Sequence, residues 1–356
     1  MRFKFKLSLL SAFILLALTL ALIGLLFVFE ASVAESFAAF GEPYHFVRLQ
    51  SLRLLIGLAA FFVLSFLPHN LWRKLSPLLF FGGLALLLAI FIPGLGQAHN
   101  GARRWLQLGP VFFQPVELFK LGLVSFYAHW LTKHQRLAPF LFLTGLISFL
   151  LLLQPDLGSL LVILSISFSM FFLSGAKIWH FLTLTLAAII ILGLLIISSP
   201  YRWQRVMTFV NPELDPLGSS FHIRQITLAL GSGSWLGQGI GKSRQRFSYV
   251  PEASTDSIFA IIAEEVGFLG SLGVISLFAL YFYLGFKLIN RQKNQYSYLL
   301  ECGLLIWIAS QTLLNLAAVV ALVPLTGLPL PFFSYGGTSL IMILAANGII
   351  VAGNKT

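Results

Sequence analysis

The chain has 356 residues, of which 58% are hydrophobic and only 10% are charged. Soluble domains carry roughly a quarter charged residues, so this composition excludes a soluble protein and indicates a polytopic membrane protein. The formal net charge of +11 would suit nucleic-acid binding, but in a membrane protein it more often reflects cytoplasmic anchoring loops and anionic partners, so no nucleic acid is expected.

Ten continuous apolar runs follow one another along the chain, each near the length of about 20 residues that a membrane helix needs. Their predicted limits are 8–29, 53–68, 77–93, 115–132, 138–153, 158–174, 180–198, 257–286, 299–323 and 335–353. The runs do not alternate with period two, which excludes a β-barrel. We therefore predict an all-α bundle of ten transmembrane helices in one integral membrane domain, 1–356.

The distribution of Lys and Arg predicts the orientation of this bundle. With the N-terminus inside, the cytoplasmic set is Arg2, Lys4, Lys6, Arg73, Lys74, Lys133, Arg136, Lys177, Lys287, Arg291, Lys293 and Lys355, whereas the short outer loops hold Arg48, Arg53, Arg103 and Arg104. Positive charge marks cytoplasmic loops, so both termini are expected in the cytoplasm.

An ionisable pair lies inside the fourth run. Pro115 suits the first turn of a helix, and Glu117 and Lys120 then lie on one helical face as i,i+3 neighbours. Charges at this depth are costly and often mark a site. Either the two residues neutralise each other so that the helix can insert, or Lys120 faces a cavity and binds an anion. Asp156, in QPDLGS (154–159), is similarly either a helix cap or a site residue.

The long segment at about 199–256 is expected on the outer face. It carries the cations Arg202, Arg205, Arg224, Lys242, Arg244 and Arg246. They either are solvated or attract lipid headgroups, or they form a cationic cradle for a phosphate-bearing substrate. The stretch GSGSWLGQGIGKS (231–243) is not a nucleotide-binding loop, because Leu236 stands where that motif requires Gly. We predict a re-entrant or surface-lying loop there.

The stretch YVPEASTDSIFAIIAEE (249–265) places four carboxylates at and inside the eighth run, namely Glu252, Asp256, Glu264 and Glu265. Ser254 or Thr255 could cap this helix, and Asp256 would suit its first turn. Glu264 and Glu265 lie about 12–13 Å deeper, where Lys120 is a plausible partner for one of them. We predict an acidic wall of an outer cavity opposite a basic wall. The last outer loop, 323–340, is rich in Pro and Gly and is expected to close the same cavity.

These motifs occur in an order that resembles the shape, elongation, division and sporulation (SEDS) family, and the sequence looks closer to FtsW than to RodA. The similar stretches are NGARRWLQLG (100–109), FQPVELFK (113–120), QPDLGS (154–159), NPELDPLGSSFHIRQ (211–225), GSWLGQGIGKSRQRFSYVPEASTDSIFAIIAEEVGFLG (233–270) and PLTGLPLPFFSYGGTSL (324–340). The chain departs from the family pattern at Val116, Ser254 and Ser257, where Ser254 stands in place of a frequent His, and none of these changes removes an acid or a base on which the expected mechanism relies.

The resemblance implies a peptidoglycan glycosyltransferase of the bacterial inner membrane that polymerises lipid II at the outer leaflet, in cell division or elongation. It implies Asp256 as the catalytic residue. The candidate substrate-binding residues are Arg103, Arg104, Glu117, Lys120, Asp156, Arg202, Arg205, Lys242, Glu252, Thr255 and Ser334. The expected partners are a class B penicillin-binding protein transpeptidase and other divisome or elongasome membrane proteins.

In the expected mechanism Asp256 takes a proton from the acceptor sugar hydroxyl, whose oxygen attacks the anomeric carbon of the donor with inversion. Arg104, Lys120, Arg202 and Arg205 would stabilise the undecaprenyl pyrophosphate that leaves. A divalent cation, Mg or Mn, could share this task through carboxylates and phosphates, and no organic cofactor is expected. The alternatives are a lipid II flippase, in which intramembrane charges are equally at home, and a scaffold that activates a partner enzyme.

Overall fold

The computed structural model describes residues 8–99, 102–109, 111–211, 213, 220–245, 250 and 252–355, and the cations Arg2, Lys4, Lys6 and Arg246 lie outside these ranges. The described part forms twelve helices. Ten of them overlap the predicted apolar ranges: α1 (Leu9–Phe40), α2 (His45–Leu64), α3 (His69–Ala89), α4 (Pro115–Leu131), α5 (Leu137–Leu153), α6 (Leu157–Leu173), α7 (Ile178–Ile197), α10 (Ile258–Ile289), α11 (Gln295–Val319) and α12 (Gly337–Gly353). The other two, α8 (Pro200–Val210) and α9 (Phe221–Ser232), lie in the long segment between α7 and α10.

Within the described ranges, six helices are long and apolar enough to cross a membrane, namely α1, α2, α3, α7, α10 and α11. The first three differ from their predicted limits, since hydropathy marks apolar residues and not helix ends. Helix α1 continues past Glu30 and takes up about half of the segment between the first two predicted runs. It ends where Gly41 adopts φ 70° and donates its N–H to the Phe37 carbonyl, a left-handed C-terminal cap.

The prediction of an all-α fold is wrong in the loop between α3 and α4. Strands β1 (Gly96–His99), β2 (Ala102–Leu108) and β3 (Val111–Phe113) form an antiparallel sheet in the order β1-β2-β3. Leu106 pairs with Phe113 in the register of β2 and β3, and Leu106 is 1% exposed. Trp105 stacks on Phe112 with ring centroids 5.1 Å apart. Cross-strand aromatic and apolar pairs of this kind stabilise a short sheet.

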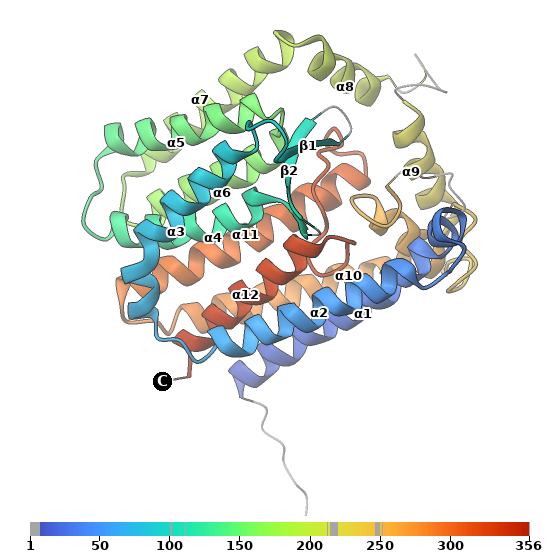
Figure 1. Ribbon diagram of the computed structural model, residues 1–356, viewed down its shortest axis with the longest axis horizontal. Helices are drawn as coiled ribbons and strands as arrows, with labels where there is room; N and C mark the ends of the chain where they lie inside the picture. The colour runs from blue at the N-terminus through green and yellow to red at the C-terminus, as the bar shows by residue number, and fades with distance from the viewer. Residues whose placement is uncertain are drawn as a thin grey trace, which may run out of the picture.

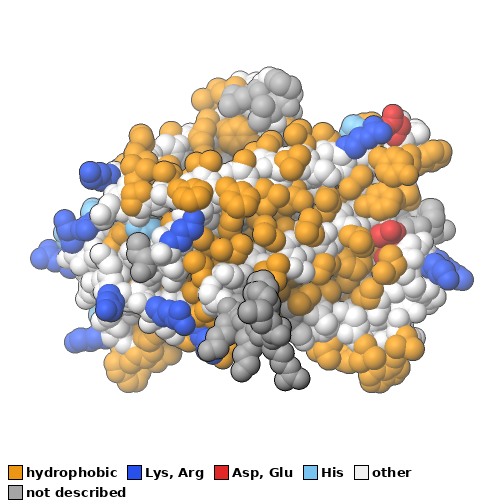
Figure 2. Space-filling model, turned by 90° about the horizontal axis from the view of Figure 1, so that it is seen from below, with side chains coloured by type: hydrophobic (Ala, Val, Ile, Leu, Met, Phe, Trp, Pro, Cys, Tyr) orange, Lys and Arg blue, Asp and Glu red, His pale blue; other side chains and the backbone are white. Residues whose placement is uncertain are grey.

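Helix α11 lies in the middle of the bundle, where it packs against α4, α6, α10 and α12, while α1 packs against α2 and α10 (Figure 1). The two ends of the bundle differ. At one end Lys355 Nζ donates to Ser65 Oγ over 3.0 Å, and Gln292 Nε2 donates to the Gly353 carbonyl over 2.7 Å. At the other end lie the sheet, α8 and α9 (Figure 1). Figure 2 shows Lys and Arg gathered toward one end and a broad apolar belt between the ends.

The stretch 231–243, which we call the glycine-rich loop, packs against a break in α10. Gly267 interrupts this helix with φ 69° and ψ −171°. The loop forms hydrogen bonds with backbone groups of α10 on both sides of the break. Gln238 N–H donates to the Glu264 carbonyl at 2.9 Å, and Phe268 N–H donates to the Ser234 carbonyl at 2.9 Å. The loop thus replaces hydrogen bonds that the broken helix cannot make, as membrane proteins require of irregular backbone.

Replacing Gly237 with alanine is expected to destabilise this junction. Gly237 has φ +82°, and an added Cβ would lie 2.1 Å from the Glu265 carbonyl oxygen. The left-handed backbone alone costs an L-residue about 1–2 kcal/mol, and the steric clash adds to that cost. Thermal unfolding in detergent measures the effect. Gly193→Ala in α7, where an added Cβ meets nothing within 4 Å, is the matched control and should leave the unfolding temperature unchanged or raise it. Equal unfolding temperatures for Gly237→Ala and the wild type would contradict this account.

Candidate functional site

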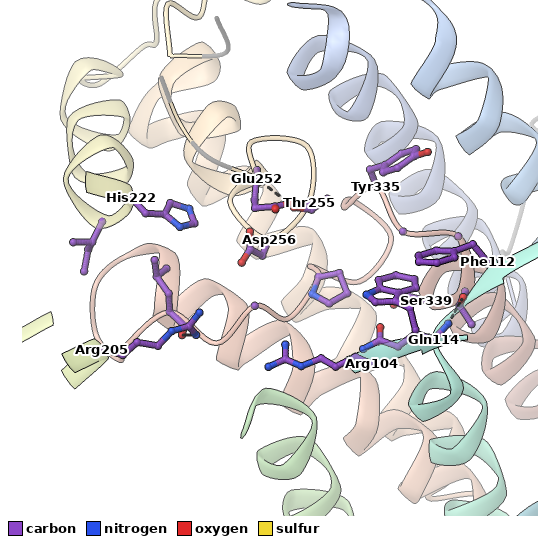
Figure 3. A pocket seen from close by; sticks show the side chains of 18 of the residues that line it. Arg104, Phe112, Gln114, Arg205, His222, Glu252, Thr255, Asp256, Tyr335 and Ser339 are labelled. Carbon is purple, nitrogen blue, oxygen red and sulfur yellow. Dashed lines mark hydrogen bonds between the residues drawn. The ribbon is translucent and has the colours of Figure 1, made fainter. Parts of the chain in front are cut away.

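A cavity of about 540 Å³ opens at the end of the bundle that carries the sheet (Figure 3). Its walls come from α2, the sheet, α8, α9, the segment before α10 and the loop before α12. The polar residues that line it are Arg53, Arg104, Gln114, Arg205, Thr208, His222, Glu252, Thr255, Asp256, Tyr335, Thr338 and Ser339. Of the candidate residues from the sequence, the cavity therefore brings together Arg104, Arg205, Glu252, Thr255 and Asp256.

Asp256 lies in a turn that precedes α10. The turn begins at Glu252, whose φ of 52° is left-handed, and Ser257 is the N-cap residue, with no side-chain capping bond. The expectation that Ser254 or Thr255 caps this helix is therefore wrong. Because the turn directs both hydroxyls elsewhere, Ser254 Oγ donates to Glu35 Oε2 at 3.4 Å and Thr255 Oγ1 donates to Glu252 Oε2 at 2.8 Å.

The environment of Asp256 favours its neutral form. Burial, and after it the negative charge of Glu252, raises the pKa of Asp256 from 3.8 to about 7, while Arg205 and a hydrogen bond from Ser257 act in the opposite direction. A carboxyl group with a pKa near neutral pH suits general-base catalysis, because it can both accept and release a proton under cellular conditions.

Three guanidinium groups form the basic wall of the cavity. Arg205 Nη1 donates to the Leu325 carbonyl at 3.1 Å, and Arg104 Nη2 donates to the Pro155 carbonyl. Arg53 lies 4.6 Å from the centre of the Tyr335 ring, in a cation–π contact, and packs closely against Gly337. These groups can bind phosphate oxygens by charge-assisted hydrogen bonds.

The N-terminus of α12 points at the same cavity. Residues 336–339 line it, and the N-cap Gly336 provides no side-chain capping bond. Thr338 Oγ1 instead accepts a hydrogen bond from the Gln114 N–H at 3.1 Å. The first backbone N–H groups of a helix and its dipole favour an anion at this position.

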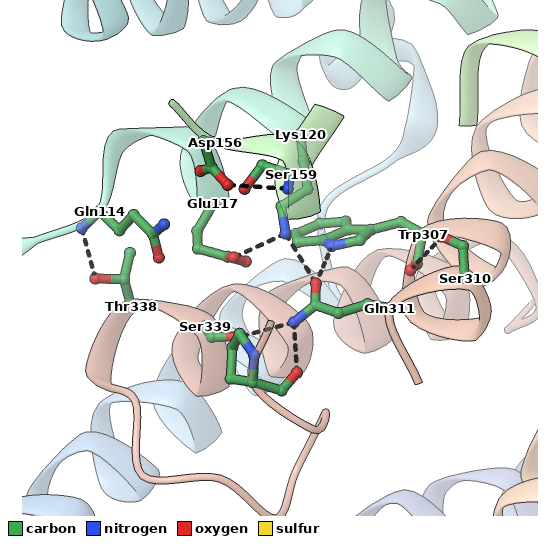
Figure 4. A network of polar contacts seen from close by, with 11 residues as sticks. Gln114, Glu117, Lys120, Asp156, Ser159, Trp307, Ser310, Gln311, Thr338 and Ser339 are labelled. Carbon is green, nitrogen blue, oxygen red and sulfur yellow. Dashed lines mark hydrogen bonds and ion pairs between the residues drawn. The ribbon is translucent and has the colours of Figure 1, made fainter. Parts of the chain in front are cut away.

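A buried polar network lies beneath the cavity floor (Figure 4). Lys120 Nζ donates to Glu117 Oε1 at 2.7 Å and to Gln311 Oε1 at 2.8 Å. Gln311 Nε2 in turn donates to the carbonyl of Pro329 at 3.0 Å, and Pro329 lines the cavity. Lys120 is 0% exposed and Glu117 is 1% exposed. This geometry supports the self-neutralising pair and not a Lys120 that faces the cavity.

Glu264 and Glu265 do not form an acidic wall, and neither is the partner of Lys120, so both expectations are wrong. The Glu264 carboxylate accepts hydrogen bonds from Ser243 Oγ and from the Arg244 N–H. Glu265 Oε1 accepts one from the Gly241 N–H at 3.2 Å. Both carboxylates bind the glycine-rich loop, which sequence spacing could not place against α10.

The remaining candidate residues lie outside the cavity lining. Asp156 caps α6, because its Oδ1 accepts the Ser159 N–H at 3.1 Å. Ser334 is 5% exposed, accepts the Leu330 N–H at 2.7 Å and donates to the Thr255 carbonyl. Arg202 Nη1 donates to the Leu195 carbonyl at 3.1 Å. The exposed Arg103 lies on β2, and Lys242 lies on the glycine-rich loop.

Sequence reasoning missed seven polar residues of the cavity, namely Arg53, Gln114, Thr208, His222, Tyr335, Thr338 and Ser339. His222 Nε2 is 2.8 Å from Ser257 Oγ, next to Asp256. Except for Arg53 and Thr208, all lie inside the six quoted stretches, so the motifs contained the signal. Arg53 carries no signal beyond its charge, because its position at the start of an apolar run predicts an ordinary residue of a short outer loop.

The carboxylates of Asp256 and Glu252 are the side chains here that suit a divalent cation. Among the described residues no three His, Cys, Asp or Glu side chains are arranged to hold a metal ion. An ion bound here would have to take its other ligands from water and substrate phosphates, the usual mode for Mg²⁺.

The chain is similar to known proteins over nearly its whole length. The family model of the cell cycle proteins FtsW, RodA and SpoVE matches residues 10–355. A Nitrosococcus halophilus protein named "Probable peptidoglycan glycosyltransferase FtsW" is 40% identical over 95% of this chain and 90% of its own. The stage V sporulation protein E of Bacillus subtilis is 36% identical over 95% of this chain and 94% of its own.

Two solved structures are similar in fold. One chain, from a structure titled as a peptidoglycan synthase complex that coordinates polymerization and crosslinking, superposes with a TM-score of 0.79 at 31% identity and covers 96% of both chains. The rod shape determining protein RodA of Thermus thermophilus superposes with a TM-score of 0.70 at 29% identity and covers 99% of both chains.

Proposed function

Since the chain belongs to the FtsW/RodA/SpoVE family of cell cycle proteins and is a multi-pass membrane peptidoglycan glycosyltransferase, we propose that Asp256 is its general base and that the cavity holds the reacting ends of two lipid II molecules. The observation that carries this proposal is Asp256, half-buried in a cavity of about 540 Å³ that Arg53, Arg104 and Arg205 also line. The volume lies within the range of about 300–1,000 Å³ of small-molecule sites.

In this mechanism the carboxylate of Asp256 accepts the proton of the acceptor C4 hydroxyl. The acceptor oxygen forms a bond to the anomeric carbon of the donor, and the bond from that carbon to the pyrophosphate oxygen breaks. Attack from the face opposite the leaving group converts the α linkage to β. Undecaprenyl pyrophosphate leaves with the electron pair.

The developing negative charge of the pyrophosphate is stabilised by Arg53, Arg104 and Arg205 and by the N-terminus of α12. These groups replace Lys120 and Arg202 of the sequence-based mechanism, because neither lines the cavity. A divalent cation held by the Glu252 carboxylate and by substrate phosphates would add positive charge to the site.

All ten helices in the predicted apolar ranges cross the inner membrane, and both termini lie in the cytoplasm. Support comes from the cations at one end of the bundle and the apolar belt in Figure 2. The cavity then opens on the outer face, where lipid II is consumed. A class B penicillin-binding protein is the proposed partner, supported by the similarity to a chain of a peptidoglycan synthase complex.

The pH dependence of lipid II polymerisation by the purified chain tests this function. Asp256 accepts a proton only when it is ionised, so the rate is expected to fall about tenfold for each pH unit below the pKa, which is about 7. Glu252→Gln removes a like charge that raises this pKa, so the midpoint should move to lower pH. Glu42→Gln, at an exposed ion pair with Arg48, is the control and should leave the midpoint unchanged.

A rate that is constant across pH 5–9 would contradict a base with this pKa. Transfer of lipid II across liposome membranes with no glycan product would contradict polymerisation itself and favour the flippase alternative. Product that appears only when a second polymerase is added would favour the scaffold alternative.

A further inference from the structure

Asn315 of α11 holds the backbone of Asp256 although it does not line the cavity. Its Nδ2 donates to the Asp256 carbonyl at 2.7 Å and also to the Leu328 carbonyl at 2.7 Å. The side chain is 2% exposed. Because both partners are carbonyl oxygens, the amide nitrogen must face them, and the assignment of the amide is not arbitrary.

The turn that carries Asp256 is fixed through three consecutive carbonyl groups. The Ser254 carbonyl accepts the Tyr335 N–H at 2.7 Å, the Thr255 carbonyl accepts Ser334 Oγ, and the Asp256 carbonyl accepts Asn315 Nδ2. The first two donors belong to the loop before α12, which is itself irregular. Asn315 belongs to a continuous helix at the centre of the bundle, so it ties the turn to a rigid element.

Gln311 lies one turn before Asn315 on α11 and has a parallel role at the cavity floor. Its Nε2 donates to the Pro329 carbonyl at 3.0 Å, and its Oε1 accepts Lys120 Nζ. The two amides therefore attach both the turn of Asp256 and the loop before α12 to the same face of α11, since residues four apart share a helical face.

We propose that Asn315 is a positioning residue for glycosyl transfer, which sets the location of the Asp256 carboxylate by holding the Asp256 and Leu328 carbonyl groups at a fixed separation. This inference rests on the proposed role of Asp256 as the base. The residue type follows from the task, because an amide nitrogen offers two N–H donors. Neither a carboxylate nor an aliphatic side chain offers an N–H donor at this position. The position of Asp256 matters because a general base works only within hydrogen-bond reach of the proton that it accepts.

The test compares Asn315→Leu and Asn315→Ser with the wild type for unfolding temperature, kcat and KM in lipid II polymerisation. A displacement of about 1 Å can cost about 100-fold in rate, so kcat is expected to fall by about 10- to 100-fold. KM should change little, because the base acts in the transition state and not in ground-state binding. Asn315→Ser leaves room for water to satisfy both carbonyls, so it tests positioning even if the leucine variant fails to fold.

Asn347→Leu is the matched control. Asn347 is 0% exposed in α12 and accepts the Tyr281 hydroxyl at 2.8 Å, away from the cavity. The Asn347→Leu variant should have a lower unfolding temperature than the wild type, but its kcat per folded molecule should stay near the wild-type value. A wild-type kcat for folded Asn315→Ser, or the same kcat loss in the control, would overturn the proposal. Asp256→Asn in the same assay separates the two proposals. If the Asn315 proposal is overturned while Asp256→Asn is inactive, only the role of Asn315 fails. If Asp256→Asn is active, the role of Asp256 as the base fails.

Discussion

Replacing Lys120 with methionine is expected to destabilise the protein by about 3–5 kcal/mol, the usual cost of removing one partner from a buried ion pair. The Glu117 carboxylate would remain 1% exposed without its 2.7 Å partner. Gln311 would also lose the Lys120 donor beneath the cavity floor. Thermal unfolding in detergent measures the loss, and the single Cys302, which is buried, provides a thiol whose labelling reports unfolding.

The double variant Glu117→Gln with Lys120→Met should recover much of this stability, because it removes the uncompensated charge. An exposed pair is the control. Arg48→Ala breaks the ion pair with Glu42, whose side chains are 68% and 57% exposed, and should cost about 1 kcal/mol or less. If Lys120→Met unfolds at the same temperature as Arg48→Ala, the buried pair does not carry the stability assigned to it.

The order of the apolar helices could be predicted, because hydropathy reports which residues suit an apolar environment; among the described helices, six are long and apolar enough to cross a membrane. The ends could not. Hydropathy ended the first run at Glu30, whereas the helix continues to Phe40 and ends at the left-handed Gly41. The sheet at 96–113 was also missed, because its strands are short and their pairing depends on contacts across turns.

Local pairing was predictable, but long-range pairing was not. The i,i+3 ion pair of Glu117 and Lys120 follows from helical spacing alone. The third member, Gln311, lies 191 residues from Lys120, and helix neighbours cannot be read from one sequence. For the same reason Lys120 was paired wrongly with Glu264 or Glu265, which bind the glycine-rich loop.

The sequence predicted an outer cavity with acidic and basic residues at one end of the bundle. The cations that line it could not be chosen by charge alone. Arg205 lines the cavity. Arg202, which lies about one turn earlier on α8, instead donates to the Leu195 carbonyl of α7. Which of the two lines the cavity depends on how α8 packs on the bundle, and sequence spacing does not give that packing.

Replacing Asp256 with asparagine is expected to reduce glycan polymerisation by about 10²–10⁴-fold, the usual contribution of a general base. Asparagine has nearly the same shape but cannot accept the proton. The protein should remain folded. Burial raises the pKa of Asp256 from 3.8 to about 7 in the folded chain, so its ionisation lowers stability progressively as the pH rises between these two values, and the full cost is present above about pH 7. A neutral asparagine removes that cost, and the variant should unfold at pH 8 at the wild-type temperature or higher.

Asp156→Asn is the matched control for this change. Asp156 caps α6, and asparagine caps a helix about as well as aspartate, so this variant should keep both its stability and its activity. Loss of activity in folded Asp156→Asn would give Asp156 a role beyond capping.

Glycan chain growth from purified lipid II, followed in detergent with the isolated wild-type, Asp256→Asn and Asp156→Asn proteins, tests the central role of Asp256 most directly. Long glycan products from the wild type and from Asp156→Asn, with almost none from folded Asp256→Asn, are the predicted result. Undiminished chain growth by Asp256→Asn would contradict it.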